Sequence, residues 1–405
     1  MYSDDIVNFF KKFNVDVETV SIMNGSVVDT YELKLNSNTL ISKIKSLEEN
    51  LTLELGMPIR IVAPIPNKKT IGIEVPTSIR KIIPFEKYIP ELLNSKMYLP
   101  FILGEDVYGN PIIEDIATFP HLLIAGTTGS GKSNLINSII TSLLIVKEFN
   151  AVKFVLIDPK RVELSAYEGL FNLDICGMPE VIKSSSHALR ALHCVIKEME
   201  ERYKILENEG IKNMMEYARC GSSENPPIVI IIDELADLML SEESIQIEVA
   251  LQKIAQLGRA ASIHLIVATQ RPTVNIITGK IKTNLTTRIS LKMAQSVDSK
   301  TILNCKGAEK LLGKGDMIFQ KTLAVRYHGV LITDEFIAHV ITKIKKSYEH
   351  LRQKIYIRDE SITVEFLMRT YNFTKSQSEN LMVTYNTQKE RFVSLFKEIY
   401  ELVNS

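Results

Sequence analysis

Eight consecutive residues at positions 126–133 carry the clearest chemical signal of this 405-residue chain, reading Gly-Thr-Thr-Gly-Ser-Gly-Lys-Ser. Glycines in such a run let the backbone curl until successive N–H groups converge on one anion. A lysine followed by a hydroxyl suits a triphosphate and its Mg²⁺ ion, with Lys132 on the β- and γ-phosphates and Ser133 on the metal. We therefore expect ATP to bind at Gly126, Thr127, Thr128, Gly129, Ser130, Gly131, Lys132 and Ser133.

An acid pair, Asp233 and Glu234, follows the apolar run 228–232. An apolar strand that ends in an acid is typical of sites that hold Mg²⁺ beside a phosphate loop, and this predicts Asp233 as a second metal residue. Glu234 is then placed to orient or activate the attacking water. Without the phosphate loop, the same pair would also suit a helix start with Asp233 as its N-cap.

Two further polar signatures follow apolar runs in the same way. Thr269 and Gln270 come after the run 264–268, and Asp158-Pro159-Lys160 comes after the run 153–157. We expect Gln270 to touch the γ-phosphate and report hydrolysis, although an ordinary cap or turn would explain the same residues. For 158–160 a role in the site and a helix-capping role are both open.

The elements that must position these residues are short apolar runs of strand length alternating with helical stretches. The runs lie at 121–125, 153–157, 228–232 and 264–268, and the residues after the phosphate loop, 134–144, have a helical pattern. This alternation predicts an α/β fold with a mainly parallel sheet covered by helices. Ligands bind beyond the carboxyl ends of such strands, where all four signatures lie.

Changes of pattern along the chain divide it into three regions. Residues 1–95 are expected to form a small α+β domain, with helices at 4–13 and 39–53 and strands at 29–35, 59–64 and 70–75. Residues 96–335 are expected to form the P-loop domain, which includes a long amphipathic helix at 186–209 that Gly210 ends. Residues 336–405 are mostly helical in pattern, and two short helices at 363–371 and 376–384 could form a divergent helix-turn-helix.

Bulk composition excludes some classes of protein. Lys and Arg together number 48, as do Asp and Glu, so the chain is not coated with positive charge, although a local basic loop remains compatible with nucleic acid. The start has no signal-peptide pattern, and no run approaches the roughly 18 apolar residues of a membrane span. None of the four cysteines forms a C-x-x-C pair, so we expect free thiols in a reducing cytoplasm.

Taken in order, these motifs resemble the FtsK/SpoIIIE family of DNA translocases, within the RecA-like ring ATPases. The resemblance covers the phosphate loop with the residues 120–125 before it, the segments 157–160, 163–165, 233–239, 263–264, 268–272 and 277–279, and the glycine-containing segments 307–313 and 315–317. Segments 30–33 and 71–76 are similar to the small α domain of the family. A set of motifs in this order is far more specific than a phosphate loop alone.

The resemblance implies a RecA-like core, a homo-hexameric ring around double-stranded DNA, and ATP bound between subunits. It implies that Arg259 completes the neighbouring subunit's site, where an arginine would stabilise charge on the transferred phosphate. It also implies channel loops whose Arg271, Lys280, Lys282 and Lys300 meet backbone phosphates. A helix-end arginine favoured by the helix dipole and solvated surface lysines are the alternative interpretations.

The chain also departs from the family's pattern. Members that act at septa carry N-terminal membrane spans, which we do not find here, and the motif of the family's orientation-reading C-terminal domain is not found at 359–405. The leading hypothesis is a cytoplasmic, ATP-hydrolysing translocase of duplex DNA that serves segregation or transfer with an unknown membrane-anchored or DNA-processing partner. The alternatives are a coupling ATPase that acts on single-stranded DNA with a relaxase, a secretion ATPase and a non-hydrolysing scaffold. The segment 271–282 contains no aromatic residue to stack on bases, which favours duplex DNA.

Overall fold

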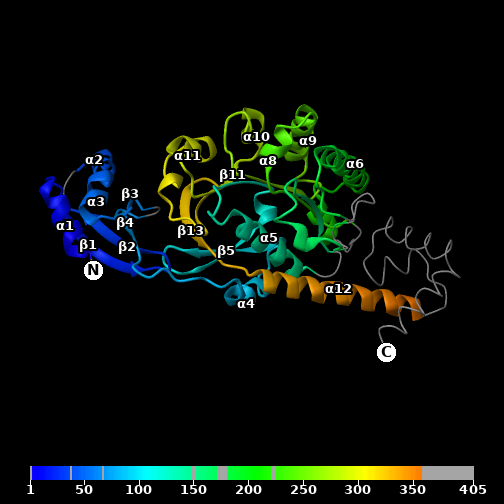
Figure 1. Cartoon of the computed structure of the whole chain (residues 1–405), viewed down its shortest axis with the longest axis horizontal. Coiled ribbons are helices and arrows are strands. Elements are labelled where there is room, and N and C mark those ends of the chain that lie inside the picture. Colours follow the sequence, from blue (N-terminus) through cyan, green and yellow to red (C-terminus); the bar gives the residue numbers. More distant parts are fainter. Residues whose placement is uncertain are drawn as a thin grey trace.

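The computed structural model describes residues 2–36, 39–65, 68–147, 151–170, 173, 180–219 and 225–357, with side chains up to residue 346. Within these residues the strands form a four-stranded sheet and a nine-stranded sheet. The smaller sheet and its helices lie at one end of the molecule, and the larger sheet occupies the centre (Figure 1).

The small unit is an antiparallel sheet of order β1-β2-β4-β3 packed against three helices. Its core consists of large apolar side chains that are almost fully buried, among them Ile6, Phe10, Leu33, Leu51 and Ile73. The helix predicted at 39–53 is broken at Leu47 into two. The elements are α1 (Ser3–Lys12), β1 (Val17–Asn24), β2 (Val28–Leu35), α2 (Ile41–Ser46), α3 (Glu48–Leu55), β3 (Arg60–Val62) and β4 (Ile71–Pro76).

The large sheet is mixed, with strand order β6-β5-β13-β12-β11-β7-β10-β9-β8. The last five strands in this order run parallel, and the other four extend the sheet through antiparallel pairs. The predicted α/β P-loop fold is confirmed, and the parallel half carries the predicted signatures. The strands are β5 (Pro100–Asp106), β6 (Pro111–Asp115), β7 (His121–Ala125), β8 (Lys153–Ile157), β9 (Ile228–Ile232), β10 (Ile263–Thr269), β11 (Thr287–Leu291), β12 (Asp316–Gln320) and β13 (Ala324–Gly329).

Helices cover both faces of this sheet (Figure 1). The helices α4 (Ile89–Leu93), α5 (Lys132–Val146) and α12 (Asp334–Ile357) contribute to one apolar core. The opposite core is built by α6 (Ser185–Glu209), α8 (Leu235–Met239), α9 (Ser244–Leu257), α10 (Gly279–Asn284) and α11 (Ser296–Leu303), and α7 (Met214–Arg219) follows α6. Gly210 ends α6 in a left-handed conformation, as predicted.

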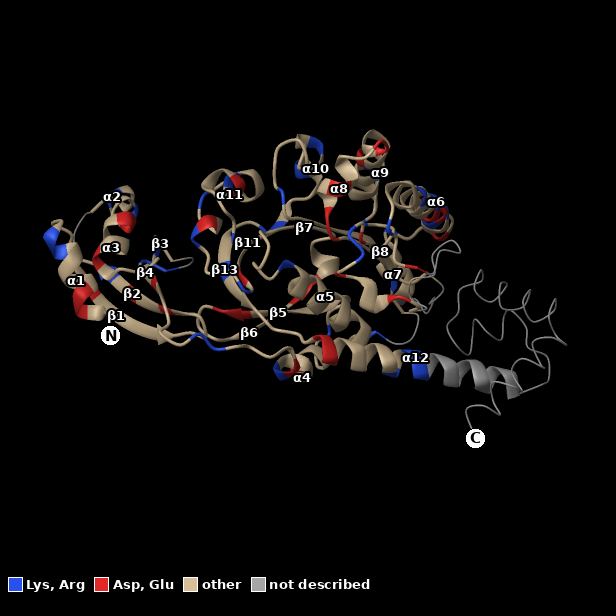
Figure 2. Cartoon of the chain, in the orientation of Figure 1, with Lys and Arg blue, Asp and Glu red and all other residues tan. Residues whose placement is uncertain are grey.

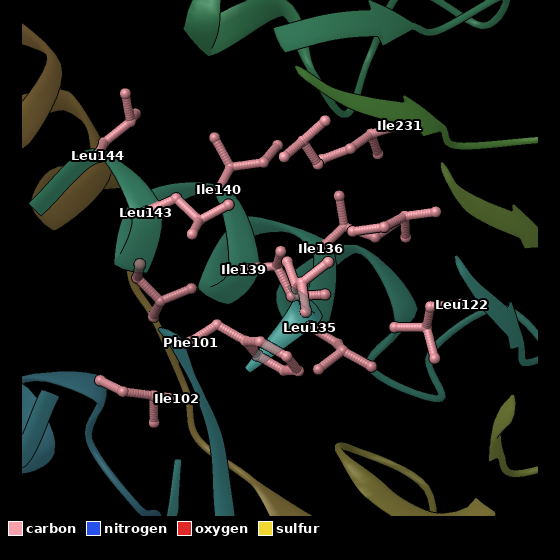
Figure 3. Packing of buried hydrophobic residues seen from close by; sticks show 14 of the residues in the cluster. Phe101, Ile102, Leu122, Leu135, Ile136, Ile139, Ile140, Leu143, Leu144 and Ile231 are labelled. Atoms are coloured by element: carbon pink, nitrogen blue, oxygen red, sulfur yellow. The ribbon is translucent and has the colours of Figure 1, made fainter. Parts of the chain in front are cut away.

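Helix α5 is the element that fixes the end of the phosphate loop. Its side chains Ile136, Ile139, Ile140 and Leu143 are at most 1% exposed. Figure 3 shows them packed among residues of β5, β7 and β9, including Phe101. Burying one such side chain contributes about 1.5–3 kcal/mol, so the first turn of α5, which contains Lys132, is held firmly against the sheet.

The expectations about the cysteines, a membrane span and the C-terminal helices have different outcomes. Cys194 takes part in a disulfide bond, which corrects the expectation of free thiols throughout, and Cys305 is an exposed free thiol. No helix in the described part of the chain is long and apolar enough to cross a membrane. The helices predicted at 363–371 and 376–384 lie outside the described residues.

Candidate nucleotide-binding site

The predicted phosphate loop connects β7 to α5. Gly129 and Gly131 have positive φ angles of 76° and 104°, which glycine adopts without steric cost. A Cβ atom on Gly126 would lie 2.4 Å from Ser130 Oγ, so the loop is also too tight for a side chain there. The backbone of Gly126 donates to Thr269 O at 3.2 Å. The loop is therefore anchored to the carboxyl end of β10, beside the predicted Gln270.

Lys132 and Asp233 form a buried ion pair directly behind the loop. Lys132 Nζ lies 2.6 Å from Asp233 Oδ1 and 2.5 Å from Asp233 O, and the two side chains are 3% and 0% exposed. Burial raises the pKa of Asp233, and the Lys132 ammonium opposes that rise. Asp233 Oδ2 is buried and has no hydrogen-bond partner, which leaves it free to accept from a water bound to Mg²⁺. Ser133 follows Lys132 in the first turn of α5, and its hydroxyl together with the Asp233 carboxylate is a donor set that fits the ion.

Glu234 is held by donors from two neighbouring strand ends. Its Oε1 accepts from Thr269 Oγ1 at 2.7 Å, and Gln270 N donates to both carboxylate oxygens at 3.1–3.2 Å. Lys160 Nζ lies 3.1 Å from Oε2. Burial alone would raise the pKa of Glu234, but the hydrogen bonds from Thr269 and Lys160 outweigh it and lower the pKa. The carboxylate is therefore ionised and fixed in orientation.

The signature Asp158-Pro159-Lys160 divides into two roles. Asp158 is completely buried, and its carboxylate accepts four backbone N–H groups at 2.9–3.1 Å, from Lys160, Arg161, Val162 and Leu164. Turns and bends rather than a helix follow Asp158, so it does not act as the helix cap that was the alternative, and its carboxylate instead organises the loop that follows it. Lys160 instead reaches Glu234, as the site alternative requires.

A cavity of about 700 Å³ lies at the phosphate loop, and Lys132 and Ser133 are among the residues that line it. The phosphate loop, Gln270 and Glu163 contribute to its lining, and Gln270 Oε1 accepts from Thr128 Oγ1 at 3.2 Å. The lining also includes residues that sequence reasoning missed, among them Arg80, Lys81, Ile82, Ile83, Lys314, Gly315, Gly329, Val330 and Leu331. The glycines at 313 and 315 were visible as part of the family pattern, but nothing in their chemistry pointed to this cavity.

Arg259 lies far from the phosphate loop of its own chain. It is exposed, in the turn between α9 and β10, so it is at the amino end of the strand whose carboxyl end anchors the loop. Seven residues of strand at about 3.3 Å each separate the two ends by roughly 20 Å. An arginine cannot reach across that distance, so Arg259 can act on a nucleotide only from a neighbouring subunit.

The four predicted DNA-contacting residues occupy different environments. Arg271 and Lys300 are exposed, the first just past β10 and the second on α11. Lys280 is 62% exposed and lies 3.8 Å from Glu248. Lys282 is only partly exposed, and burial lowers its pKa. Figure 2 shows positive charge on α10 beside acidic residues on α8 and α9, so the surface here is of mixed charge.

The fold and this loop define a P-loop protein of the RecA-like type, with a nucleotide-binding site at the carboxyl edge of its parallel strands. The family models narrow this class. The FtsK/SpoIIIE family matches residues 90–274, and the FtsK alpha domain matches residues 1–77. The chain belongs to the FtsK/SpoIIIE family.

Individual relatives support the same placement. The DNA translocase FtsK of Chlorobaculum tepidum is 45% identical over 332 residues, covering 78% of this chain and 41% of the relative. That of Caldanaerobacter subterraneus subsp. tengcongensis is 40% identical over 362 residues, covering 87% and 50%. The chain thus spans about half the length of the curated relatives it matches.

Solved structures show the fold independently. The pCW3 conjugation coupling protein TcpA, in its monomer form with ATPγS, is 26% identical with a TM-score of 0.58, covering 85% of this chain and 99% of that one. The cytoplasmic domain of the type VII secretion ATPase EccC of Thermomonospora curvata is 24% identical with a TM-score of 0.52, covering 61% and 31%. At that identity, EccC supports the fold alone.

Proposed function

We propose that this protein is an ATP-hydrolysing motor that translocates double-stranded DNA through a homo-hexameric ring. One observation carries the proposal: Lys132 lines the cavity at the phosphate loop and pairs with Asp233, and the adjacent Glu234 is held in place by Thr269, Gln270 and Lys160. Nucleotide-binding scaffolds that have lost hydrolysis generally lack the lysine or the acids, and both are present here. We propose DNA as the substrate because the relatives are named DNA translocases.

Each site residue has a distinct task in the proposed reaction. Lys132 binds the β- and γ-phosphates, and Ser133 and Asp233 hold the Mg²⁺ ion, which supplies charge neutralisation when bound. Glu234 orients the attacking water and accepts its proton, since its ionised carboxylate is fixed by Thr269 and Gln270. Gln270 contacts the γ-phosphate, and its loss on hydrolysis is transmitted through Gln270 to the segment that begins at Arg271.

The position of Arg259 supports the proposed ring. Because it cannot reach the nucleotide of its own chain, its proposed role as a phosphate-stabilising arginine requires a neighbouring subunit. A ring that shares its sites in this way couples hydrolysis at one interface to movement at the next. We also propose that Asp158 keeps Lys160 in place beside Glu234 by tying down the intervening loop.

The DNA contacts are proposed for Arg271, Lys280, Lys282 and Lys300, of which all but Lys282 are exposed. Contacts to backbone phosphates are insensitive to sequence and weaken with salt. We place the motor in the cytoplasm, where duplex DNA and ATP are both available, and propose DNA segregation or transfer as its process.

DNA-dependent ATP hydrolysis tests the proposal. Purified protein is incubated with ATP and Mg²⁺, with and without long duplex DNA, and assembly is followed by light scattering. The proposal predicts faster hydrolysis with duplex DNA and little hydrolysis by Lys132→Ala. An assembled ring whose hydrolysis does not change on adding DNA would refute the motor function.

A second candidate is a coupling ATPase of a conjugative element, acting on single-stranded DNA with a relaxase. The likeness to TcpA over most of both chains favours it. The absence of aromatic residues in the segment 271–282 favours duplex DNA instead. Comparing stimulation by equal masses of duplex and single-stranded DNA separates the two, since the coupling role predicts stronger stimulation by single strands.

A further inference from the structure

A tight turn at Gly313-Lys314-Gly315 lies against the phosphate loop. Lys314 N donates to Gly129 O at 3.3 Å, and Gly315 N donates to Ser130 O at 2.7 Å. In a trans peptide the N–H points away from the C=O, so holding Ser130 O directs the N–H of Gly131 to the opposite side. Gly131 lines the cavity, so this turn sets the direction of a phosphate-binding donor.

The contact between turn and loop is close enough to exclude a side chain. A Cβ on Gly131 would lie 2.5 Å from Gly315 N and 2.9 Å from its Cα. The turn itself has three successive residues with positive φ, at 78°, 51° and 89°, and the middle one is Lys314. Non-glycine residues are uncommon in this conformation, so the turn depends on contacts from outside to keep its shape.

Arg80 supplies those contacts from one side. Its Nη2 donates to Gly313 O at 2.8 Å and to Lys314 O at 2.7 Å. Arg80 belongs to the segment that links the last strand of the small unit to the large sheet, and 233 positions separate it from Gly313. One guanidinium nitrogen of Arg80 thus donates to the carbonyls of Gly313 and Lys314 in the same turn whose N–H groups donate to the phosphate loop.

Buried charges hold the turn from the other side. Asp316 Oδ2 accepts from Leu312 N at 2.7 Å, and Arg326 pairs with Asp316 at 2.6 and 2.9 Å. Arg326 also donates to Glu74 of β4 at 2.7 Å. Both supports of the turn therefore connect it to the small unit, one through Glu74 of β4 and the other through Arg80 in the segment that directly follows β4.

We propose that Arg80 is a positioning residue for nucleotide phosphates, acting through the turn 313–315 on the phosphate loop, so that the small unit sets the nucleotide affinity of the motor. The inference rests on nucleotide binding at the phosphate loop. If Arg80 only stabilised the fold, its loss would lower the thermal stability and leave the nucleotide affinity of the folded protein unchanged.

Equilibrium binding of a fluorescent ATPγS analogue, with inorganic tripolyphosphate as competitor, tests this without relying on hydrolysis. Losing two charge-assisted hydrogen bonds to the turn should weaken binding of both ligands by about tenfold in Arg80→Ala. Arg80→Lys, whose single ammonium can donate to both carbonyls, should recover much of the loss. Lys69→Ala is the matched control, since it removes an exposed charge from the same unit and should bind as the wild type does.

Three results would overturn the inference. They are unchanged ATPγS affinity in folded Arg80→Ala, weakened ATPγS binding with unchanged tripolyphosphate binding, and an equal loss of affinity in Arg80→Lys and Arg80→Ala. If Arg80→Ala shows no cooperative melting transition, Arg80→Gln replaces it, and wild-type affinity in that variant has the same meaning. Failure of the wild type to bind either ligand would instead refute the proposed function.

Discussion

Replacing Glu234 with Gln separates the chemical step from folding and binding. The side chain keeps its shape, and one amide oxygen can still accept from Thr269 Oγ1 and Gln270 N, as Oε1 does now. What is lost is the negative charge and its pairing with Lys160, which is 39% exposed. A partly exposed pair of this kind contributes about 1 kcal/mol or less to stability.

The expected effect on hydrolysis is much larger. A positioned general base contributes about 10²–10⁴-fold to a rate, which corresponds to about 3–5 kcal/mol in the activation free energy. We therefore predict that Glu234→Gln folds and binds ATP like the wild type, while its single-turnover hydrolysis rate falls by roughly 10²–10⁴.

The assay mixes excess enzyme with radiolabelled ATP and follows phosphate release, with ATPγS-analogue affinity and thermal melting measured on the same preparation. Lys160→Met serves as a comparison, since it removes the pairing and leaves the carboxylate. Hydrolysis by Glu234→Gln at the wild-type rate would refute the assignment of the water-activating role. A large loss of ATP affinity would show that Glu234 acts on binding instead.

Three further predictions follow from other contacts. Arg259→Ala and Lys132→Ala should each be inactive alone. Mixing the two variants should restore some ATPase activity, because a mixed ring contains interfaces at which both residues are intact. Mixed rings that recover no activity would contradict a site shared between subunits. Gly131→Ala should bind nucleotide at least about tenfold more weakly and lose roughly 1–3 kcal/mol of stability. The new Cβ would lie 2.5 Å from Gly315 N, and the backbone at residue 131 has a φ angle of 104°, which alanine rarely adopts. A variant that melts and binds nucleotide as the wild type does would contradict this prediction. Burial lowers the pKa of His121 from 6.5 to about 4, so the unfolded chain takes up this proton before the folded chain does. The contribution of His121 to stability is therefore complete above pH 6.5 and declines by up to about 1.4 kcal/mol per pH unit as the pH falls toward 4. Urea denaturation should show a shallower decline for His121→Asn, and equal slopes would contradict the assignment.

The sequence was most informative where function depends on consecutive residues. The phosphate loop and the pair Asp233-Glu234 each follow a buried strand, and parallel strands bring their carboxyl ends to one edge, so proximity followed from the pattern alone. Asp158 and Lys160 could not be separated in this way, because capping and site roles require the same residue types.

Long-range packing was not predictable from local pattern. The cavity wall at Arg80–Ile83 and the turn at Gly313 meet only because the large sheet continues into antiparallel strands. Strands β12 and β13 were missed because the buried charges of Asp316 and Arg326 interrupt their apolar pattern. Arg326 pairs with both Asp316 and Glu74, and Arg60 also pairs with Glu74. The sequence alone does not show which buried charges pair with each other.

Directed movement on duplex DNA is the most direct test of the central claim. Protein, ATP and Mg²⁺ are added to a long duplex that carries a fluorescent third strand at one site, and displacement of that strand is followed over time. The motor proposed here should displace it with ATP, more slowly at higher salt, and should leave it in place with ATPγS or in the Glu234→Gln variant. An assembled protein that hydrolyses ATP on this duplex and leaves the third strand bound would contradict translocation.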